Sequence, residues 1–246
     1  MNILHPLRLS TITHFIDICV LVHFEEFIKS LEHQLAQPLP GKEAQSMLRP
    51  YSPLSPSLDP PALLTPKESA VMALIYPIDN KAHLLLTERP IYKGAHSGQI
   101  SFPGGKLEKN ETALEAALRE TKEEVGVDAE WIKVLGNLSQ LYVWASNFNV
   151  NPYVGYLNEK PNFLPDPREV ATILEAPLEM FFKPGVVKEK PLKNALGFGL
   201  NAPYFDVFDR TLWGATAMII SELIHIIDKS EQDYYKIAAD IKSPLR

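Results

Sequence analysis

The chain has 246 residues, of which 46% are hydrophobic and 22% are charged, which is typical of one globular domain or of one domain with an appendage. Its net charge of −6 and pI near 5.7 argue against a general nucleic-acid binder, which would present a basic face. No stretch reaches the roughly 20 apolar residues of a membrane span, and the single cysteine, Cys19, excludes an internal disulfide and favours a reducing, cytoplasmic location.

The N-terminal quarter does not have the pattern of a core domain. Residues 1–22 are apolar in part, but Asp17 interrupts them and they lack the clean run and cleavage site of a signal peptide, so we expect a poorly structured extension. Residues 23–68 begin with an amphipathic helix and continue as a proline-rich, extended segment. The apolar face of that helix consists of Phe24, Phe27, Ile28, Leu31 and Leu35.

The main folded domain is expected over residues 69–230. Two buried strands joined by a turn at Asp79 and Asn80 open it, and further strands and helices follow at uneven intervals, which indicates an α+β fold. A final helix or tail is expected over residues 231–246. The expected strands are 70–76, 82–87, 131–135, 138–143, 150–157, 170–174 and 186–187, and the expected helices are 177–182 and 211–227.

One helix inside this domain has clear start and stop signals. Thr112 and Glu115 have the spacing of a capping box, in which each side chain satisfies a free backbone amide of the other residue. Gly126 suits the position just after a helix, where a left-handed conformation is usual. The residues between these signals are mostly Ala, Leu, Glu, Arg and Lys, which are good helix formers.

Three carboxylates gather on one face of this helix. Glu120, Glu123 and Glu124 stand at positions i, i+3 and i+4, where like charges repel and stabilise nothing. Oxygen clusters of this kind attract hard divalent cations, above all Mg²⁺ and Mn²⁺. Arg119, four residues before Glu123, is placed to hold that carboxylate. A solvated acidic helix face is the alternative, and the carboxylates alone do not decide between the two.

The spacing over the whole stretch resembles the Nudix box, the signature of hydrolases that use a divalent metal to cleave a nucleoside diphosphate linked to another group. Thr121 departs from it, because the family usually has an aliphatic residue there. The matching positions are Gly105, Glu111, Arg119, Glu120, Glu123, Glu124, Gly126 and Val127.

The flanking sequence is similar to the coenzyme A pyrophosphatase subfamily. Residues 85–89 (LLTER) precede residues 96–105 (HSGQISFPGG), as in that signature, and the segments 146–152 and 213–217 agree with it. Where the subfamily has a basic residue before the His-x-Gly segment, this chain has Gly94, with Lys93 beside it. Lys93 would therefore have to replace that basic residue.

The resemblance implies an α/β/α sandwich with a mixed β-sheet, Mg²⁺ or Mn²⁺ as cofactor, and Glu120, Glu123 and Glu124 as metal ligands. It further implies a general base, either Glu120 or Glu123 or a glutamate from a later loop, for which Glu169 is the first candidate and Glu175 the second. Arg119 would support the catalytic carboxylates. The candidate substrate-binding residues, able to meet phosphate through cationic groups or close backbone approach, are Arg89, Lys93, His96, Gly104 and Gly105.

The expected activity is hydrolysis of the diphosphate bond of coenzyme A, giving 4′-phosphopantetheine and adenosine 3′,5′-bisphosphate. The alternatives are a Nudix hydrolase for ADP-ribose or a dinucleotide, and a non-catalytic Nudix binding or regulatory module, against which the intact carboxylate set argues. The expected partner is a small-molecule substrate, with no nucleic acid and no membrane. A homodimer is compatible with the sequence.

Overall fold

The computed structural model describes residues 24–51, 65–92, 97–193 and 199–242, so the expectation for residues 1–22 lies outside the described residues. A mixed sheet of eight strands forms the centre of the fold, in the order β3-β2-β1-β7-β5, with β4 paired to β1, β6 to β7 and β8 to β2. β1 and β7 run parallel and the other pairs are antiparallel. The strands are β1 (Lys67–Ile78), β2 (Lys81–Glu88), β3 (Ile100–Ser101), β4 (Gly104–Lys106), β5 (Lys133–Asn137), β6 (Leu141–Val143), β7 (Phe148–Tyr156) and β8 (Thr172–Pro177).

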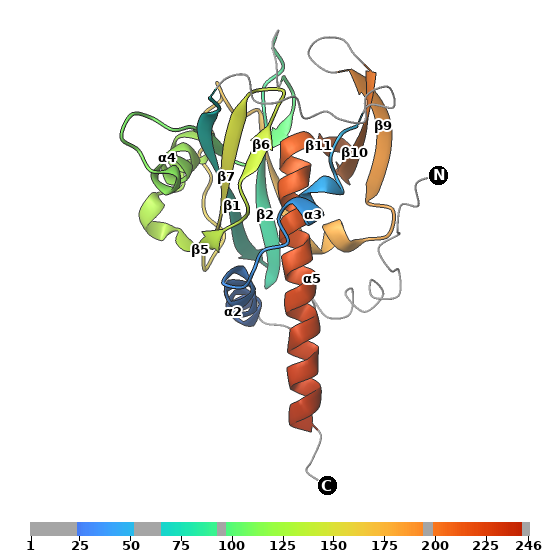
Figure 1. Cartoon of the computed structure of the whole chain (residues 1–246). Coiled ribbons are helices and arrows are strands. Elements are labelled where there is room, and N and C mark those ends of the chain that lie inside the picture. The colour runs from blue at the N-terminus through green and yellow to red at the C-terminus, as the bar shows by residue number, and fades with distance from the viewer. Residues whose placement is uncertain (1–23, 52–64, 93–96, 194–198, 243–246) are drawn as a thin grey trace.

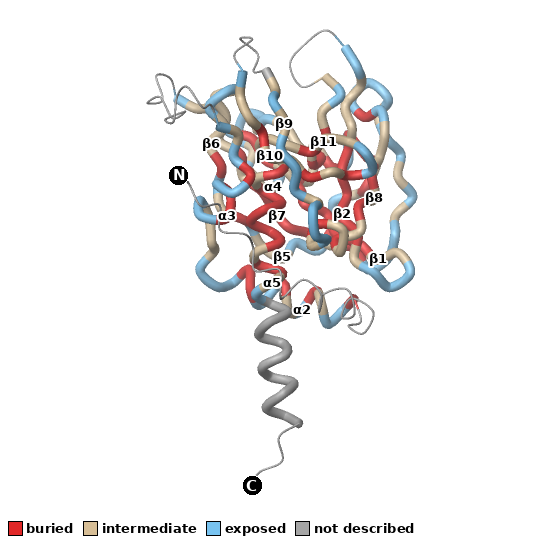
Figure 2. The backbone as a smooth tube through the Cα atoms, turned by 90° about the vertical axis from the view of Figure 1, so that its right-hand side faces the viewer, coloured by how far each residue is buried: buried red, intermediate tan, exposed pale blue. Residues whose placement is uncertain are grey.

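Helices cover both faces of this sheet, which explains why β1 is an almost continuous apolar run. On one face, Met72 and Leu74 pack in the same cluster as Ala117 of helix α4 (Ala113–Val125). On the other face, Ala73 and Ile75 join a cluster that includes helices α2 (Phe24–Leu35) and α5 (Gly214–Lys242). Figure 1 shows α4 on one side of the sheet and α2 with α5 on the other, and Figure 2 shows the buried residues concentrated between these layers. The predicted α+β sandwich with a mixed sheet is confirmed.

The turn between β1 and β2 also forms as predicted. Asp79 and Asn80 have φ of 50° and 63°, and Ile78 pairs with Lys81 across them. Positive φ at both central residues is what a two-residue hairpin turn that follows the strand twist requires. The short turn fixes the register of β2, which ends at Glu88, directly before Arg89.

A second, three-stranded antiparallel sheet lies beside α5 (Figure 1) and was only partly predicted. It contains β9 (Val187–Lys193), β10 (Gly199–Val207) and β11 (Arg210–Trp213). Its apolar face is buried through Phe205 and Leu212, and the Phe205 ring meets Phe181 edge-on at 5.2 Å. Phe181 belongs to η2 (Leu178–Phe182), which is a 3-10 helix.

Two expectations for the C-terminal helix need correction. The helix expected from residue 211 begins at Gly214, because Arg210–Trp213 pair with β10 as β11. The same helix then continues to Lys242, across the boundary that the sequence suggested at residue 230. No helix in the described ranges is both long and apolar enough to cross a membrane.

A buried carboxylate of α5 holds the segment that follows α2. Glu222 is 0% exposed and accepts hydrogen bonds from the backbone amides of Gly41 and Ser139, both at 3.2 Å, and from Nε2 of Gln45 at 2.8 Å. Gln45 lies in α3 (Lys42–Ser46), a short helix within the segment expected to be extended and proline-rich. One side chain thus satisfies three donors from two distant parts of the chain.

We therefore expect Glu222→Ala to destabilise the fold strongly. Each donor left buried without an acceptor costs about 1–3 kcal/mol, so the loss in free energy of unfolding should be several kcal/mol. Denaturant unfolding measures it, with Glu179→Gln as control, since Glu179 forms only a half-exposed pair with Lys81 at 3.3 Å. The control should lose no more than about 1 kcal/mol. Equal effects of the two changes would contradict this role of Glu222.

Candidate active site

Helix α4 carries the acidic face and is capped as the sequence predicts. The backbone amide of Thr112 donates to Oε2 of Glu115 at 2.8 Å, and the amide of Glu115 donates to the Thr112 hydroxyl at 3.3 Å. At the other end, Gly126 has φ of 76° and its amide donates to the carbonyl of Lys122. These caps fix where the helix begins and ends, and so fix the direction in which its carboxylates project.

Arg119 connects this helix to the glycine-containing strand before it. Its guanidinium binds Glu111 bidentately, with Nε to Oε1 at 2.8 Å and Nη2 to Oε2 at 3.1 Å. Nη1 donates to Glu120 at 2.8 Å and to Glu123 at 3.1 Å, and Nη2 also donates to the carbonyl of Lys106 at 3.2 Å. The predicted contact with Glu123 is confirmed. The bond to Glu111 was missed, because Glu111 lies in the loop before the helix, where helical spacing gives no signal.

Gly104 and Gly105 lie in β4, which pairs with β1 directly beside Glu120. A β-carbon on Gly105 would stand 2.1 Å from Oε1 of Glu120, so the carboxylate occupies the space that a side chain would need. A β-carbon on Gly104 would stand 2.4 Å from the carbonyl oxygen of Ala70, which is backbone and cannot move away easily. The two glycines therefore have different functions, since one preserves strand pairing and the other makes room for a candidate catalytic carboxylate.

Glu124 is the most buried acidic side chain of the helix, at 3% exposure. Its pKa is raised to about 8, mainly by burial and also by the charges of Glu120 and Glu169, while Arg89 and the backbone amide of Gly104 act in the opposite direction. Burial also raises the pKa of Glu120, against the bond from Arg119. Two carboxylates with raised pKa mark a place where negative charge is unfavourably concentrated, as is common at functional sites.

Glu169 reaches this site from a loop far along the chain. It contributes to the electrostatics of both Glu120 and Glu124. The loop is docked on the end of α4, because the amide of Asp166 donates to the carbonyl of Glu124 at 3.0 Å and the amide of Leu164 to that of Val125 at 2.9 Å. The structure thus brings the first candidate for the base together with the helix carboxylates.

Glu175, the second candidate for the base, has other partners. It accepts a hydrogen bond from the hydroxyl of Tyr76 at 3.1 Å and pairs with Lys160 at 2.7 Å. Burial, reinforced by the negative charge of Glu175, raises the pKa of Tyr76 above its usual value, so the hydroxyl keeps its proton and remains a donor. These contacts give Glu175 a structural function.

Arg89 is the cation that faces the cluster. It follows β2 directly, its charge acts on Glu124, and its Nε is buried with no hydrogen-bond partner among the described residues. A buried guanidinium nitrogen without an acceptor is unfavourable, and a phosphate oxygen would satisfy it. The candidate phosphate ligands Lys93 and His96 lie outside the described residues.

The donor set fits a hard divalent cation. The acidic side chains offer only oxygen ligands, which Mg²⁺ and Mn²⁺ prefer, and the raised pKa values show that added positive charge would be favourable here. Within the described ranges, no three His, Cys, Asp or Glu side chains are arranged to hold an ion as they stand. Arg119 engages Oε1 of Glu120 and Oε2 of Glu123, so the other oxygen of each carboxylate is not bound by Arg119.

Comparisons with known proteins place this cluster inside a single matched region. A family model described as a NUDIX domain matches residues 66–192. Nudix hydrolase 3 of Caenorhabditis elegans is 33% identical over 156 residues, which is 60% of this chain and 65% of that protein. NudL, an uncharacterized Nudix hydrolase of Pectobacterium atrosepticum, is 34% identical over 168 residues, covering 67% of this chain and 86% of that protein. Among solved structures, the Nudix hydrolase RenU of M. smegmatis is 17% identical, with a TM-score of 0.44 over 73% of this chain and 90% of that one.

Proposed function

Because the chain belongs to the Nudix family, we propose that it hydrolyses the diphosphate bond of coenzyme A and its derivatives in the presence of Mg²⁺ or Mn²⁺. The observation that carries the hydrolytic part is the convergence of Glu120, Glu124 and Glu169 opposite Arg89. The coenzyme A part is supported by the flanking sequence that resembles the coenzyme A pyrophosphatase subfamily, residues 85–89 and 96–105.

In the proposed reaction, water attacks one phosphorus of the diphosphate and the bond to the bridging oxygen breaks. The products are 4′-phosphopantetheine and adenosine 3′,5′-bisphosphate, and the proton released by water passes to a carboxylate. Glu120, Glu123 and Glu124 would hold a divalent cation, which would supply positive charge to the diphosphate oxygens and lower the pKa of water. Positioning and charge stabilisation therefore account for most of the catalysis.

The chain's own residues have distinct functions in this scheme. Arg89 donates its buried Nε–H to a diphosphate oxygen. Glu169 takes the proton from water, because it lies on a loop next to the helix carboxylates and acts on both Glu120 and Glu124. Arg119 is a positioning residue, since it fixes Glu120 and Glu123 relative to Glu111. We also propose a cytoplasmic location, as the cysteine content suggests.

We expect coenzyme A to be the preferred substrate in a competition panel with ADP-ribose and NADH. The panel compares kcat/KM with Mg²⁺ and with Mn²⁺, and products are identified by mass spectrometry. A value for ADP-ribose far above that for coenzyme A would overturn the coenzyme A assignment while leaving a Nudix hydrolase. No turnover of any diphosphate would instead support a binding or regulatory module.

A further inference from the structure

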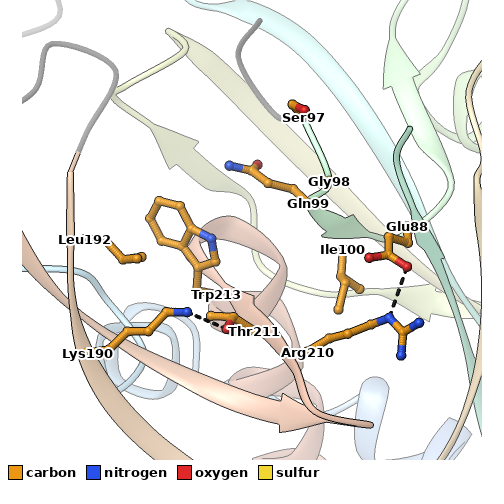
Figure 3. A pocket seen from close by; sticks show the side chains of 10 residues that line it. All are labelled: Glu88, Ser97, Gly98, Gln99, Ile100, Lys190, Leu192, Arg210, Thr211 and Trp213. Carbon is orange, nitrogen blue, oxygen red and sulfur yellow. Dashed lines mark hydrogen bonds and ion pairs between the residues drawn. The ribbon is translucent and has the colours of Figure 1, made fainter. Parts of the chain in front are cut away.

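A cavity of about 320 Å³ opens on the face of the sheet opposite to the carboxylate cluster. One wall is the end of β2 and the loop into β3, including Glu88 and Gln99, and the other wall is the second sheet, including Lys190 and Trp213 (Figure 3). The NUDIX match ends at residue 192, so β11, which completes this wall, lies outside it.

The cavity is close to the candidate active site although it is on the other face. Side chains alternate along a strand, so Glu88 lines the cavity while Arg89, the next residue, acts on Glu124. The amide of Arg89 also donates to the carbonyl of Gln99 at 3.0 Å, which holds the end of β2 to the loop into β3 within one wall of the cavity. β3 has only two residues and, among the described strands, pairs with β2 alone, on the side of β2 that also pairs with β1, so an elongated molecule can pass beside its unpaired edge.

The second sheet offers the cavity a cation with neutral partners. Arg210 pairs with Glu88 at 3.0 Å, and Lys188, on the same strand as Lys190, pairs with Asp206. Lys190 instead donates to the hydroxyl of Thr211 at 2.6 Å and lies 5.2 Å from the centre of the Tyr204 ring. The opposite charges within each of these ion pairs cancel. The ammonium of Lys190 therefore gives the described lining of the cavity a net positive charge, which favours an anionic ligand.

The indole of Trp213 adds a flat aromatic surface to this charge. Trp213 ends β11, is partly buried, and lies between Lys190 and Gln99 in the close view (Figure 3). Aromatic side chains of this kind stack on nucleobases. A stacking ring next to an unneutralised ammonium suits a nucleobase that carries a phosphate nearby.

We propose that this cavity binds the adenosine 3′-phosphate end of the substrate, with adenine on Trp213 and the 3′-phosphate on Lys190. The inference rests on the proposed function, because it places the diphosphate at Arg89 and the adenosine end around the edge of β3. It makes Lys190 a specificity-determining residue that distinguishes coenzyme A from diphosphates without the additional phosphate.

The test compares coenzyme A with 3′-dephospho-coenzyme A, which lacks only that phosphate. The parent should prefer coenzyme A by roughly tenfold to a hundredfold in kcat/KM, the worth of one hydrogen bond to a charged group. Lys190→Gln should abolish this preference, because it should lower kcat/KM for coenzyme A and leave kcat/KM for 3′-dephospho-coenzyme A unchanged. Lys188→Gln is the matched control, since Lys188 is on the same strand and paired with Asp206, and it should keep the parental preference. Trp213→Leu should raise KM for both substrates equally.

A binding measurement separates failure of this inference from failure of the proposed function. Calorimetry without metal should show adenosine 3′,5′-bisphosphate binding more tightly than adenosine 5′-monophosphate, and Lys190→Gln should remove the difference. If the parent shows this pattern but cleaves no coenzyme A, the cavity assignment holds and the substrate assignment fails. If the parent cleaves coenzyme A but Lys190→Gln and Lys188→Gln have the same substrate preference, the cavity assignment is overturned.

Discussion

Glu124→Gln is expected to lower turnover roughly a thousandfold or more, which corresponds to about 4 kcal/mol of transition-state stabilisation. The reason is that Glu124 is the buried member of the carboxylate cluster, facing both Arg89 and Glu120. Steady-state kinetics on coenzyme A measures the loss. Glu130→Gln is the control, because Glu130 is an exposed acid on the segment after α4 and should keep parental turnover.

The same change should not destabilise the metal-free fold. Replacing one carboxylate relieves repulsion of about 0.2–0.5 kcal/mol per like-charged pair. The pKa of Glu124 is about 8 in the fold against 4.5 ordinarily, so the native state retains the proton more strongly than the unfolded chain does. That contribution to stability is complete below pH 4.5 and is lost as the pH rises towards 8. The stability of the variant relative to the metal-free parent should therefore increase as the pH rises over this interval.

Metal should reverse the order of stability. A cation at a hundredfold excess over its dissociation constant should stabilise the parent by about 2.7 kcal/mol, and this gain should shrink in Glu124→Gln. Thermal unfolding with and without Mg²⁺ measures both effects. If the carboxylates formed only a solvated acidic helix face, metal would not shift the unfolding temperature of either protein. Near-parental turnover in the variant would show that Glu124 is not part of the active site.

Gly105→Ala is expected to lower turnover about a hundredfold while the protein stays folded. The new methyl group would meet the carboxylate of Glu120 at 2.1 Å, and this carboxylate is the end of a flexible side chain that can move away. The fold therefore survives, but Glu120 is displaced, and a displacement of about 1 Å near the reacting atoms can cost a hundredfold in rate. Kinetics and unfolding of the same preparation measure the two quantities together.

Two other glycines provide contrasts for this prediction. Gly136→Ala should leave both activity and stability near parental, because the nearest atom to the added carbon is Leu35 Cβ at 3.5 Å, an ordinary contact. Gly104→Ala should reduce stability, because its methyl group would meet the backbone of Ala70 at 2.4 Å. If Gly105→Ala were as active as Gly136→Ala, Glu120 would not need the position that it has in this structure.

Local signals explain what could be predicted from the sequence. The start and end of α4 depend on Thr112 and Gly126, and the hairpin turn depends on Asp79 and Asn80, so these elements agree with prediction within a residue or two. β10 was missed because Gly199–Val207 contains Gly, Asn and Pro, which are poor strand formers, and only pairing with β9 and β11 makes it a strand.

The start of α5 and the composition of the site depend on contacts that a sequence pattern does not encode. Leu212 has helical spacing with later apolar residues, but it lies in β11 and pairs with Phe205 of β10. The helix begins only at Gly214, where the chain turns with a φ of 68°. Glu169 joins the carboxylates because its loop docks on the end of α4, a contact between distant segments. Lys190 and Trp213 belong to separate strands and meet only in the folded cavity.

The most direct test of the central claim is product analysis with and without metal. Coenzyme A incubated with the full chain and Mg²⁺ or Mn²⁺ should give 4′-phosphopantetheine and adenosine 3′,5′-bisphosphate in equal amounts by mass spectrometry. A chelator should stop the reaction, and restoring the metal should restart it. Failure to cleave coenzyme A, ADP-ribose or NADH with either metal, in a folded preparation, would contradict a hydrolytic function for the carboxylate cluster.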